Sequence, residues 1–487
     1  MAPKIKLSLP LLLLLVLSVA VLAGKDPDLK QCRSQCKLKR ETAETQKRDC
    51  EKRCEETKKK KKKKEKENEG GRTNQISEVE GEETEYEERE KEEENPYVFD
   101  NEHFKARIET EEGTVRVLPK FTQKSQLLRG IENFRISILE ANHSTFVAPS
   151  HFDAEIILFV AQGRATVTVI RERRASFELQ PGDVFRVPSG APFYLINKDE
   201  REKLRIFNLL QATSIPGQLE VFHGPGGEDP ESFYTAFSWE LLEAALKVPR
   251  DELERFFKQQ KGGAIMKASR EQIQSLSQHE EIIPRIWPFS EGKTERPFNL
   301  FKQSPWQSNK FGHFHIGHPH EFSQLQDLGI AISFADFTEG SMMAPHYNSK
   351  AMTIGVVVDG GGGFQMACPH LGRRGQRGES SYQKIRGVLR RDVVIIAPAG
   401  HPFSIFASPG HGLRIVFFEI NADGNIKYLL AGKENIVNKM ERIARGLGFG
   451  TAGKEVKRIF RHQEEEFFFP GPTQLQEERG QHQWADA

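Results

Sequence analysis

The sequence predicts an all-β protein with helical extensions, in which two tandem β-barrels are each followed by a pair of helices. Three observations support this fold class: closely spaced strand-like runs, an internal repeat and helical stretches that close each repeat. From Asn95 to about Pro470, short runs with alternating and β-branched residues are separated by Gly, Pro and Asp, as in Phe134–Leu139 and Arg164–Ile170. Strands at such close spacing are typical of barrels and sandwiches.

The internal repeat divides this region into two similar halves. The segment Phe134–Ile170 has a counterpart in Ile330–Cys368, and Val187–Phe193 matches Ala397–Phe403. Self-similarity over such lengths indicates one architecture used twice. Each half then closes with two helical stretches, which are Ser238–Leu246 and Asp251–Phe257 in the first half, and Asn435–Ala444 and Lys454–Phe460 in the second.

The two helical ends carry apolar residues at helical spacing, so they need a partner surface. The simplest partner is the barrel of the same half. Because two similar halves favour symmetric closure, we instead expect exchange between protomers, which would give a homotrimer with pseudo-sixfold shape. The apolar residues in the first half are Leu242, Ala245, Leu246, Leu253, Phe256 and Phe257.

Composition separates the barrel region from the rest of the chain. Hydrophobic residues make up 37% of the 487 residues and charged residues 29%, which predicts that part of the chain cannot bury a core. Lys and Arg total 70 against 69 Asp and Glu, so the net charge of +1 excludes a uniformly basic nucleic-acid binder. We expect no nucleic-acid partner and no membrane association of the mature chain.

The first residues resemble a secretory signal peptide. Lys4 and Lys6 precede the apolar stretch Leu9–Leu22, and small residues follow with a cleavage position after Ala23. A membrane anchor is the alternative, but the apolar part is short and a polar segment follows it. Secretion would place the mature chain in an oxidising compartment, where cysteines form disulfides.

Four of the five cysteines lie in two CxxxC pairs. The pairs are Cys32 with Cys36 and Cys50 with Cys54, and a four-residue spacing puts both members on one helix face. Four cysteines allow three connectivities, and an antiparallel hairpin favours Cys32–Cys54 with Cys36–Cys50. Zinc binding is the competing interpretation, which secretion and the lack of a nearby histidine disfavour.

A charged segment follows, with the lysine run Lys58–Lys64 and the acidic stretch Glu78–Glu94. Such a segment has few apolar residues to bury, so we expect it to be disordered. The lysine run could bind membranes or nucleic acid, but we favour a solvated tract beside the acidic stretch. The predicted organisation is therefore a signal peptide (1–23), a CxxxC hairpin (24–57), a charged linker (58–94), an N-terminal barrel domain (95–260), a linker (261–295), a C-terminal barrel domain (296–470) and a polar tail (471–487).

Several phrases of the barrel region carry a family resemblance. The Gly182-x5-Pro188-x-Gly190 pattern with Asn197 resembles the cupin barrel. The two-barrel arrangement, the signal peptide and the CxxxC prefix resemble the vicilins, the 7S seed storage globulins of nuts and oil-rich seeds. The phrases similar to vicilin phrases are Asn95–Phe99, Gly227–Phe233, Pro345–Ser349, Pro398–Pro402 and Phe467–Pro472.

This resemblance implies a nutrient reservoir. It implies homotrimers that are deposited in the protein storage vacuole and degraded by vacuolar proteases at germination, and it implies a food allergen. The prefix resembles the vicilin-buried α-hairpin peptides, so an alternative function is the precursor of an antimicrobial or protease-inhibitory peptide.

Catalytic cupins hold a metal with three histidines and a carboxylate inside the barrel, and neither half retains that set. A phenylalanine at a ligand position fills the barrel with hydrocarbon, so we expect no enzyme activity and regard a copper-dependent redox enzyme as the remaining alternative. The corresponding positions hold His151, Glu155 and Phe193 in the first half, and His346, Asn348 and Phe403 in the second.

One metal site remains in the second half. Cys368 is left over once the hairpin cysteines are paired, and His370 lies two residues on, on the same side of a strand. His401 begins a later strand of the same barrel, and a thiolate with two imidazoles suits copper. The vicilin resemblance adds Tyr97 from the N-terminal arm as a fourth ligand; the alternative is a buried free cysteine beside unrelated histidines.

Asn142 begins the triplet Asn-His-Ser, an N-glycosylation acceptor in a secreted chain. It lies between two predicted strands, which indicates an exposed turn. The alternative is an unmodified turn.

Overall fold

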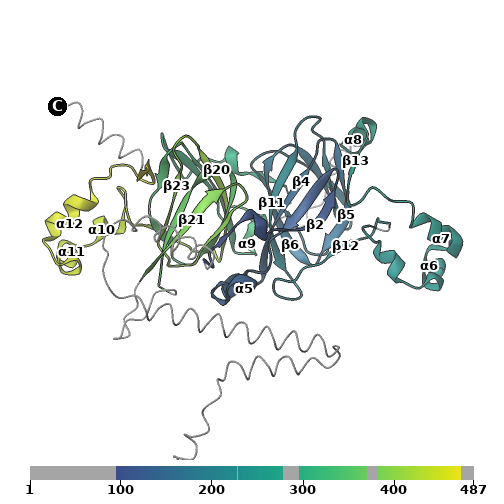
Figure 1. Cartoon of the computed structure of the whole chain (residues 1–487), viewed down its shortest axis with the longest axis horizontal. Coiled ribbons are helices and arrows are strands. Elements are labelled where there is room, and N and C mark those ends of the chain that lie inside the picture. Colours follow the sequence, from purple (N-terminus) through teal and green to yellow (C-terminus); the bar gives the residue numbers. More distant parts are fainter. Residues whose placement is uncertain (1–94, 228, 278–295, 370–381, 473–487) are drawn as a thin grey trace, which may run out of the picture. The chain divides into compact units, whose positions relative to one another are not determined.

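The computed structural model describes residues 95–227, 229–277, 296–369 and 382–472. The predicted signal peptide, the four hairpin cysteines, the charged segment, His370 and residues 473–487 lie outside the described residues. Figure 1 shows the two β-barrels that the internal repeat predicts. Among the described residues, no helix has the length and apolar character needed to cross a membrane.

The first barrel consists of two sheets that enclose a core. One sheet has the strand order β14-β9-β6-β11-β4-β3-β2, and the other has the order β12-β5-β10-β7-β8 with β13 added to β5. The strands are β2 (Lys105–Thr110), β3 (Gly113–Val117), β4 (Phe134–Ala141), β5 (Thr145–Phe152), β6 (Ala154–Gln162), β7 (Ala165–Ile170), β8 (Arg174–Leu179), β9 (Asp183–Val187), β10 (Phe193–Asn197), β11 (Leu204–Ala212), β12 (Val221–His223) and β13 (Ile265–Lys267).

The second barrel repeats this arrangement in one continuous sheet. Its main path is β15-β16-β17-β24-β20-β23-β18-β26, from which β21, β22, β19 and β25 branch. The strands are β15 (Gln307–Asn309), β16 (Gly312–Gly317), β17 (Ile330–Phe337), β18 (Ser341–Met343), β19 (His346–Asn348), β20 (Met352–Cys368), β21 (Gln383–Arg390), β22 (Val394–Ala397), β23 (Phe403–Ala407), β24 (Leu413–Ile420), β25 (Lys427–Leu429) and β26 (Phe468–Pro470).

The long strand β20 makes the sheet continuous because it bends between two sets of partners. Its first half pairs with β22 and β24, and its second half pairs with β21 and β23. Gly360 lies at the bend with a φ of 86°, in the left-handed region that favours glycine. A Cβ at this position would lie 2.0 Å from the backbone oxygen of Gly412, so no other residue fits there.

The two halves exchange their first strands. β1 (Val98–Phe99) comes from the N-terminal half but pairs with β22 of the second barrel. β14 (Phe298–Asn299) opens the C-terminal half but pairs with β9 of the first barrel. The predicted boundaries at residues 95 and 296 therefore mark changes in composition, while each half contributes an edge strand to the other barrel.

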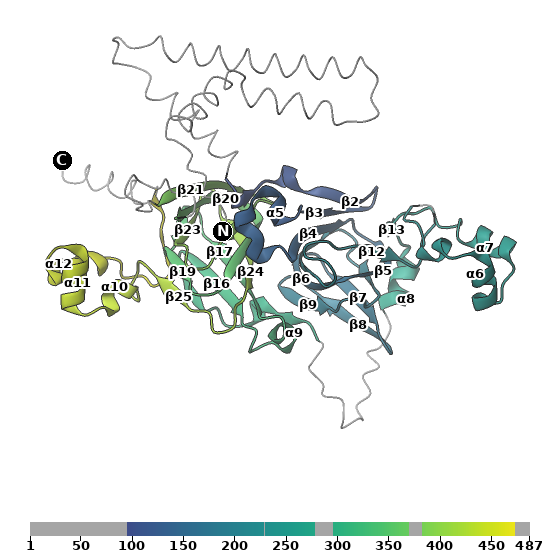
Figure 2. The same cartoon turned by 90° about the horizontal axis from the view of Figure 1, so that it is seen from below.

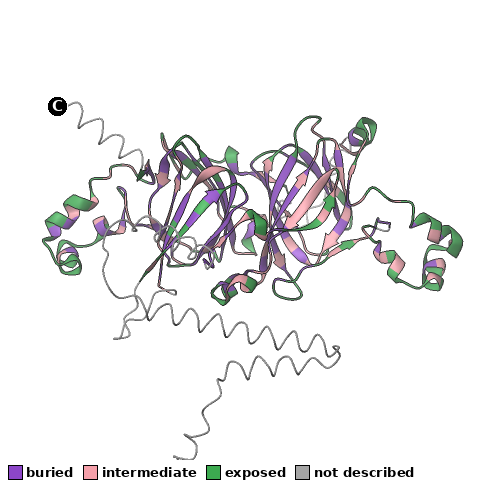
Figure 3. Ribbon diagram, in the orientation of Figure 1, coloured by how far each residue is buried: buried purple, intermediate pink, exposed green. Residues whose placement is uncertain are grey.

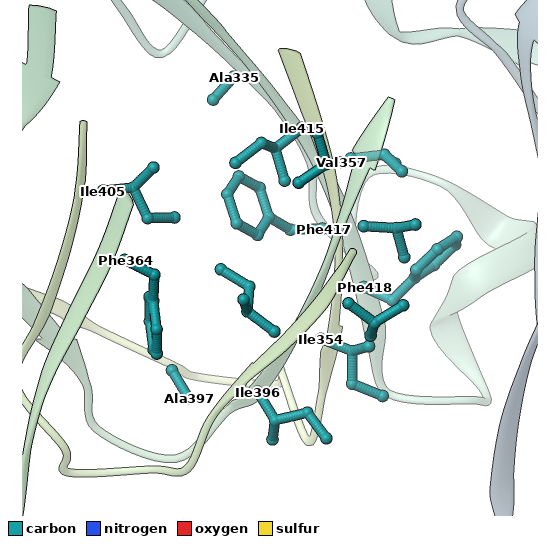
Figure 4. Close-up of a cluster of buried hydrophobic side chains, with 14 of the residues drawn as sticks. Ala335, Ile354, Val357, Phe364, Ile396, Ala397, Ile405, Ile415, Phe417 and Phe418 are labelled. Carbon is teal, nitrogen blue, oxygen red and sulfur yellow. The ribbon is translucent and has the colours of Figure 1, made fainter. Parts of the chain in front are cut away.

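Buried hydrocarbon fills the space between the strands of each barrel. Figure 4 shows this packing in the second barrel, where Phe364 of β20, Ile405 of β23, and Ile415 and Phe417 of β24 point inward. All four side chains are nearly or fully buried. Figure 3 shows the same contrast along the chain, with buried strands and largely exposed terminal helices.

The helices after the first barrel match the prediction. α6 (Trp239–Leu246) and α7 (Arg250–Phe256) pack on one another through Leu242, Leu253 and Phe257. Ser238 caps α6 by accepting a hydrogen bond from the Leu241 amide. We call these two helices the first arm.

The second barrel is followed by three helices where the sequence predicts two. The predicted helix over Asn435–Ala444 is interrupted at Met440 and Glu441, whose backbones are extended. The helices are α10 (Ile436–Lys439), α11 (Arg442–Phe449) and α12 (Gly453–Phe460). We call α11 and α12 the second arm; Figure 2 shows each arm projecting from its own barrel.

Part of the predicted linker belongs to the first barrel. Within residues 261–277, β13 pairs with β5, and α8 (Arg270–Ser277) places Ile273 against Tyr194 and Ile196. The prediction was therefore wrong for this stretch, because its few apolar residues are enough to bury one face of a short strand and a short helix.

Two arginines of the first barrel fasten it to the second. Arg186 lies 2.7 Å from both Glu155 and Asp327, the latter just after α9 (Ser323–Gln326). Arg205 in β11 pairs with Asp392 in the turn between β21 and β22. Both Arg205 and Asp392 are buried, so this pair lies inside the contact between the barrels.

Candidate metal centre

Three segments of the second barrel bring the predicted copper ligands together. Tyr97 immediately precedes β1, Cys368 ends β20, and His401 lies in the turn before β23. His370 lies outside the described residues, so the structure places three of the four predicted ligands. All three side chains are buried, with exposed fractions of 5% or less.

The pairing of β20 with β23 sets His401 opposite Cys368. Met366 is the partner of Phe403, and the Ala367 amide donates to the Pro402 carbonyl at 2.8 Å. Continuing this antiparallel register by two residues makes His401 the neighbour of Cys368, and such cross-strand neighbours have Cβ atoms about 5 Å apart. The strand register therefore brings the thiol and the imidazole to one place.

The exchanged strand β1 positions Tyr97 beside this pair. The Ile396 amide donates to the Tyr97 carbonyl at 2.8 Å, and the Asn95 side chain donates to the Arg386 carbonyl at 2.8 Å. The Cys368 thiol lies 3.5 Å from the Tyr97 hydroxyl, and the Tyr97 and His401 ring centroids are 6.4 Å apart. Burial and then the hydrogen bond to Cys368 raise the pKa of Tyr97 well above its usual range, so the phenol stays protonated without a cation.

The chemistry of this donor set fits copper. Cys368 is a free cysteine, and thiolate and imidazole are ligands that copper prefers. His401 Nδ1 lies 3.1 Å from the Ala399 carbonyl, and this hydrogen bond places the lone pair on Nε2. Among the described residues no three His, Cys, Asp or Glu side chains form a metal site as they stand; here the third described donor is a tyrosine.

The equivalent place in the first barrel lacks these donors. Phe193 pairs with Val169 as Phe403 pairs with Met366, so Arg171 and Ala191 occupy the places of Cys368 and His401. Phe298 of β14 lies opposite Val184 as Phe99 of β1 lies opposite Val394, so Arg296 occupies the place of Tyr97. Only the second copy of the fold therefore carries a thiol, an imidazole and a phenol at this position.

The cupin-type ligand positions of the second barrel are occupied by packed or hydrogen-bonded side chains. His346 is buried, its Nδ1 lies 2.8 Å from the Ala344 carbonyl, and its ring lies 4.4 Å from that of Phe403. Asn348 donates to the Thr353 hydroxyl at 2.7 Å and accepts from Lys427 at 3.1 Å. Of the three positions only His346 is an imidazole, and its ring packs against Phe403, so the second barrel does not hold the cupin ligand set.

Sequence reasoning missed a buried ion pair beside these residues. Lys427 Nζ lies 2.5 Å from Glu419 Oε1, and the two side chains are 9% and 2% exposed. The Ser333 hydroxyl also donates to Glu419 at 3.2 Å. In the sequence, this ion pair is indicated only by the lysine in the short strand β25. That indication is weak because edge strands often carry lysine.

The buried imidazole of His346 predicts a loss of stability in acid. Burial, and then the nearby Lys427 charge, lower the pKa of His346 from 6.5 to about 3. Below pH 6.5, His346 is therefore protonated in the unfolded chain. In the folded chain it stays neutral until the pH falls to about 3. Stability falls as pH decreases through this window, by about 1.4 kcal/mol per pH unit for this one group.

We expect His346→Gln to reduce this slope, because glutamine can still donate to the Ala344 carbonyl but does not titrate. The measurement is the free energy of unfolding in urea between pH 7 and pH 4. His411→Gln, at an exposed turn of the same barrel, is the control. An unchanged slope in His346→Gln would show that other groups set the acid sensitivity.

The first barrel uses its candidate residues for packing and for the contact between barrels. The His151 ring stacks on Phe222 at 4.9 Å and meets Phe233 edge-on at 5.9 Å. Glu155 pairs with Arg186 at 2.7 Å, and Phe193 is buried. These side chains therefore have structural partners.

Asn142 lies in the turn between β4 and β5, as the sequence predicts. Its side-chain amide donates to the Glu111 carbonyl at 3.1 Å in an exposed contact, and the next residue, His143, is exposed. Glycosylation at this amide would replace that hydrogen bond without disturbing a buried group.

Comparisons with known proteins agree with this architecture. The family described as Cupin matches residues 97–213 and 298–457. The chain is 51% identical to a vicilin of Juglans regia over 98% of both chains, and 52% identical to a vicilin of Corylus avellana over 94% of this chain and 98% of that protein. The crystal structure of the Corylus avellana (hazelnut) vicilin matches with a TM-score of 0.74 at 57% identity, and it covers 77% of this chain and all of the other.

These likenesses extend over nearly the whole chain and include both barrels. The identity exceeds half of all residues in the aligned parts of two relatives, and the solved structure has the same fold. The chain therefore belongs to the vicilins, the 7S globulins of the cupin family.

Proposed function

We propose that this protein is a seed storage globulin without catalytic activity. It is deposited as homotrimers in the protein storage vacuole, is degraded by vacuolar proteases at germination and acts as a food allergen. Membership in the vicilins over nearly the full chain is the observation that carries this proposal.

The interior of the barrels supports a reservoir over an enzyme. The late ligand position is a buried phenylalanine in each copy, Phe193 and Phe403. Asn348 stands in place of a second histidine, His151 stacks on Phe222 and Glu155 pairs with Arg186, so neither copy presents the set of ligands that a catalytic metal needs. We therefore propose that the chain serves as a source of amino acids.

Storage is tested in the seed itself. An antibody against the chain should label protein storage vacuoles of the mature seed, and the labelled protein should disappear during the days after imbibition. A constant amount through seedling establishment would contradict the proposal, as would a location outside the vacuole.

The two arms support the trimer. Each arm leaves apolar side chains in solvent, among them Leu241 and Phe256 on the first arm and Ile443 and Leu447 on the second. The first arm also carries the acidic residues Glu240, Glu243, Asp251, Glu252 and Glu254, and the second arm carries the basic residues Arg442, Lys454, Lys457 and Arg458. Unlike faces that complement one another generate a ring when the rotation closes, and a trimer is the smallest such ring beyond a dimer.

A second proposed function is copper binding at Tyr97, Cys368 and His401, with His370 from outside the described residues. The contact between the Cys368 thiol and the Tyr97 hydroxyl supports it. Bound copper would be a stored ion, and Cys368 and Tyr97 would hold it as thiolate and phenolate. The site would also fasten the N-terminal arm to the second barrel, because Tyr97 adjoins β1.

Copper binding predicts a charge-transfer absorption band from the Cys368 thiolate. Protein refolded with excess Cu(II) should show the band, and Cys368→Ser should abolish it. Tyr97→Phe should retain the thiolate band while lowering affinity by about tenfold or more. His411→Gln is the control. A band of equal intensity in Cys368→Ser would remove this site from consideration.

We also propose N-glycosylation of Asn142. Chain isolated from seed should lose mass on treatment with a peptide N-glycosidase, and Asn142→Gln expressed in a plant should lack that mass difference. His143→Gln preserves the acceptor triplet at an exposed residue of the same turn and is the matched control. Equal masses before and after digestion would show that the turn is unmodified.

A further inference from the structure

The outer face of β21 in the second barrel carries a row of basic side chains that neither storage nor the copper site uses (Figure 1). Buried and exposed residues alternate along this strand, so every second side chain points away from the barrel. The exposed positions are Lys384, Arg386, Val388 and Arg390. We call the three cations the basic stripe, and such a row of like charges favours an acidic partner.

The neighbouring strand supplies no such partner. The β20 residues that pair with the stripe and with Val388 are all uncharged, and they are Ala367, Gln365, Gly363 and Gly361. Arg390 pairs with Asp100 at 3.1 Å, in a contact that is exposed on both sides. The end of the stripe at Lys384 lies farthest along the strand from this ion pair.

The described chain begins beside the middle of the stripe. The Asn95 side chain donates to the Arg386 carbonyl at 2.8 Å, and Asn95 is only 6% exposed. Val98 then lies against Gly387, where a Cβ would come within 2.8 Å of Val98 Cγ2. These two contacts hold the start of the described chain against β21, so residue 94 lies one peptide unit, about 3.8 Å, from a fixed point.

The residues just before Asn95 have the opposite charge. Residues 88–94 lie outside the described residues, and their sequence contains five glutamates beside Arg89 and Lys91. Seven extended residues reach about 24 Å, and the stripe spans about 20 Å, so this segment is long enough to cover it. In an extended chain, one side would carry only acidic residues at the spacing of the stripe, namely Glu88, Glu90, Glu92 and Glu94.

We propose that residues 88–94 dock on the basic stripe of β21 and cover it. Single exposed ion pairs are weak, but the segment is joined directly to Asn95, so its effective concentration at the stripe is high. Both partners face solvent, so the association should weaken as salt screens the charges. Cleavage that removes the segment would open the stripe to another polyanion. The proposal depends on neither storage nor bound copper.

The reactivity of Lys384 in the full, metal-free chain tests this contact. Acetylation of individual lysines is followed by mass spectrometry at low salt, with the exposed Lys105 as the internal reference. We expect the double variant Glu92→Gln/Glu94→Gln to acetylate at Lys384 about threefold faster than the parent, and about 0.5 M salt to have the same effect on the parent. Glu82→Gln/Glu83→Gln is the matched control, since it makes the same charge change farther from Asn95.

Cross-linking identifies the occupant of the stripe. A carbodiimide condenses the Lys384 amine with a nearby carboxylate into an amide, with loss of water. We expect the cross-linked peptide to join Lys384 to a glutamate of residues 88–94, in chains that keep the mass of one chain under denaturing conditions. Equal acetylation of Lys384 in the parent and in Glu92→Gln/Glu94→Gln would overturn the proposal. A cross-link found only between two chains would also overturn it, because the stripe would then hold a second copy.

Discussion

Replacing Asp392 with asparagine is expected to lower the free energy of unfolding by about 3 kcal/mol, because it leaves a buried arginine without its main counter-charge. Arg205 is 3% exposed, and burial lowers its pKa, so the cation depends on local compensation. Asp392 pairs with Arg205 and lies 2.8 Å from Arg116, and Glu140 lies 2.9 Å from Arg205. Glu140 remains in the variant, which places the expected loss at the lower end of the range for broken buried pairs.

Asparagine is the informative substitution because Asp392 has a φ of 71°. Asparagine tolerates this left-handed conformation, so the variant removes the charge without straining the turn. Asp359→Asn is the matched control, since Asp359 lies 2.5 Å from Arg414 in the same barrel but is half exposed. Exposed pairs contribute about 1 kcal/mol or less, so this control should barely shift the urea midpoint.

The comparison between the two variants tests whether the contact between the barrels depends on the buried ion pair. Equal losses in Asp392→Asn and Asp359→Asn would mean that the contact between barrels does not depend on the buried pair. A double-mutant cycle with Arg205→Met measures the coupling directly, because Arg205→Met removes the cation that Asp392 compensates. The cycle should give a coupling energy larger than that of the Asp359–Arg414 pair.

The architecture was predictable because the repeat and the strand pattern are local features of the sequence. The run Phe134–Leu139 lies in β4, the run Arg164–Ile170 contains β7, and the matched family covers both halves. The exchange of β1 and β14 between barrels was not predictable. Two-residue edge strands carry no local pattern, and their partners lie more than a hundred residues away in the sequence.

The candidate metal site was likewise predictable only in part from the sequence. The convergence of Cys368 and His401 follows from the repeat, since the turn before β10 and the turn before β23 occupy equivalent places beside β7 and β20. Tyr97 came from the family resemblance alone, because only the exchanged strand β1 brings it to the second barrel. The Lys427–Glu419 ion pair was missed because contacts between different strands inside a barrel follow no characteristic residue spacing in the sequence.

Replacing Ile443 and Leu447 with glutamate is expected to abolish assembly. Both residues lie on α11, one helical turn apart, and they are 75% and 80% exposed in the single chain. Burying such side chains contributes about 1.5–3 kcal/mol each, and the variant also places two charges in an apolar contact. Light scattering should give about three times the mass of one chain for the parent and one chain for the variant. Ile215→Glu, at a residue 52% exposed outside both arms, should remain assembled.

Mixing two defective variants then tells which faces meet. Phe256→Glu breaks the first arm, at a residue 60% exposed in the single chain, and alone it should also be monomeric. If the first arm of one protomer contacts the second arm of the next, the mixture retains one intact contact and should stop at a dimer. If instead each arm contacted its own copy, either variant alone would form dimers through its intact arm. A dimer found only in the mixture therefore identifies a head-to-tail ring, and dimers of the separate variants would exclude it.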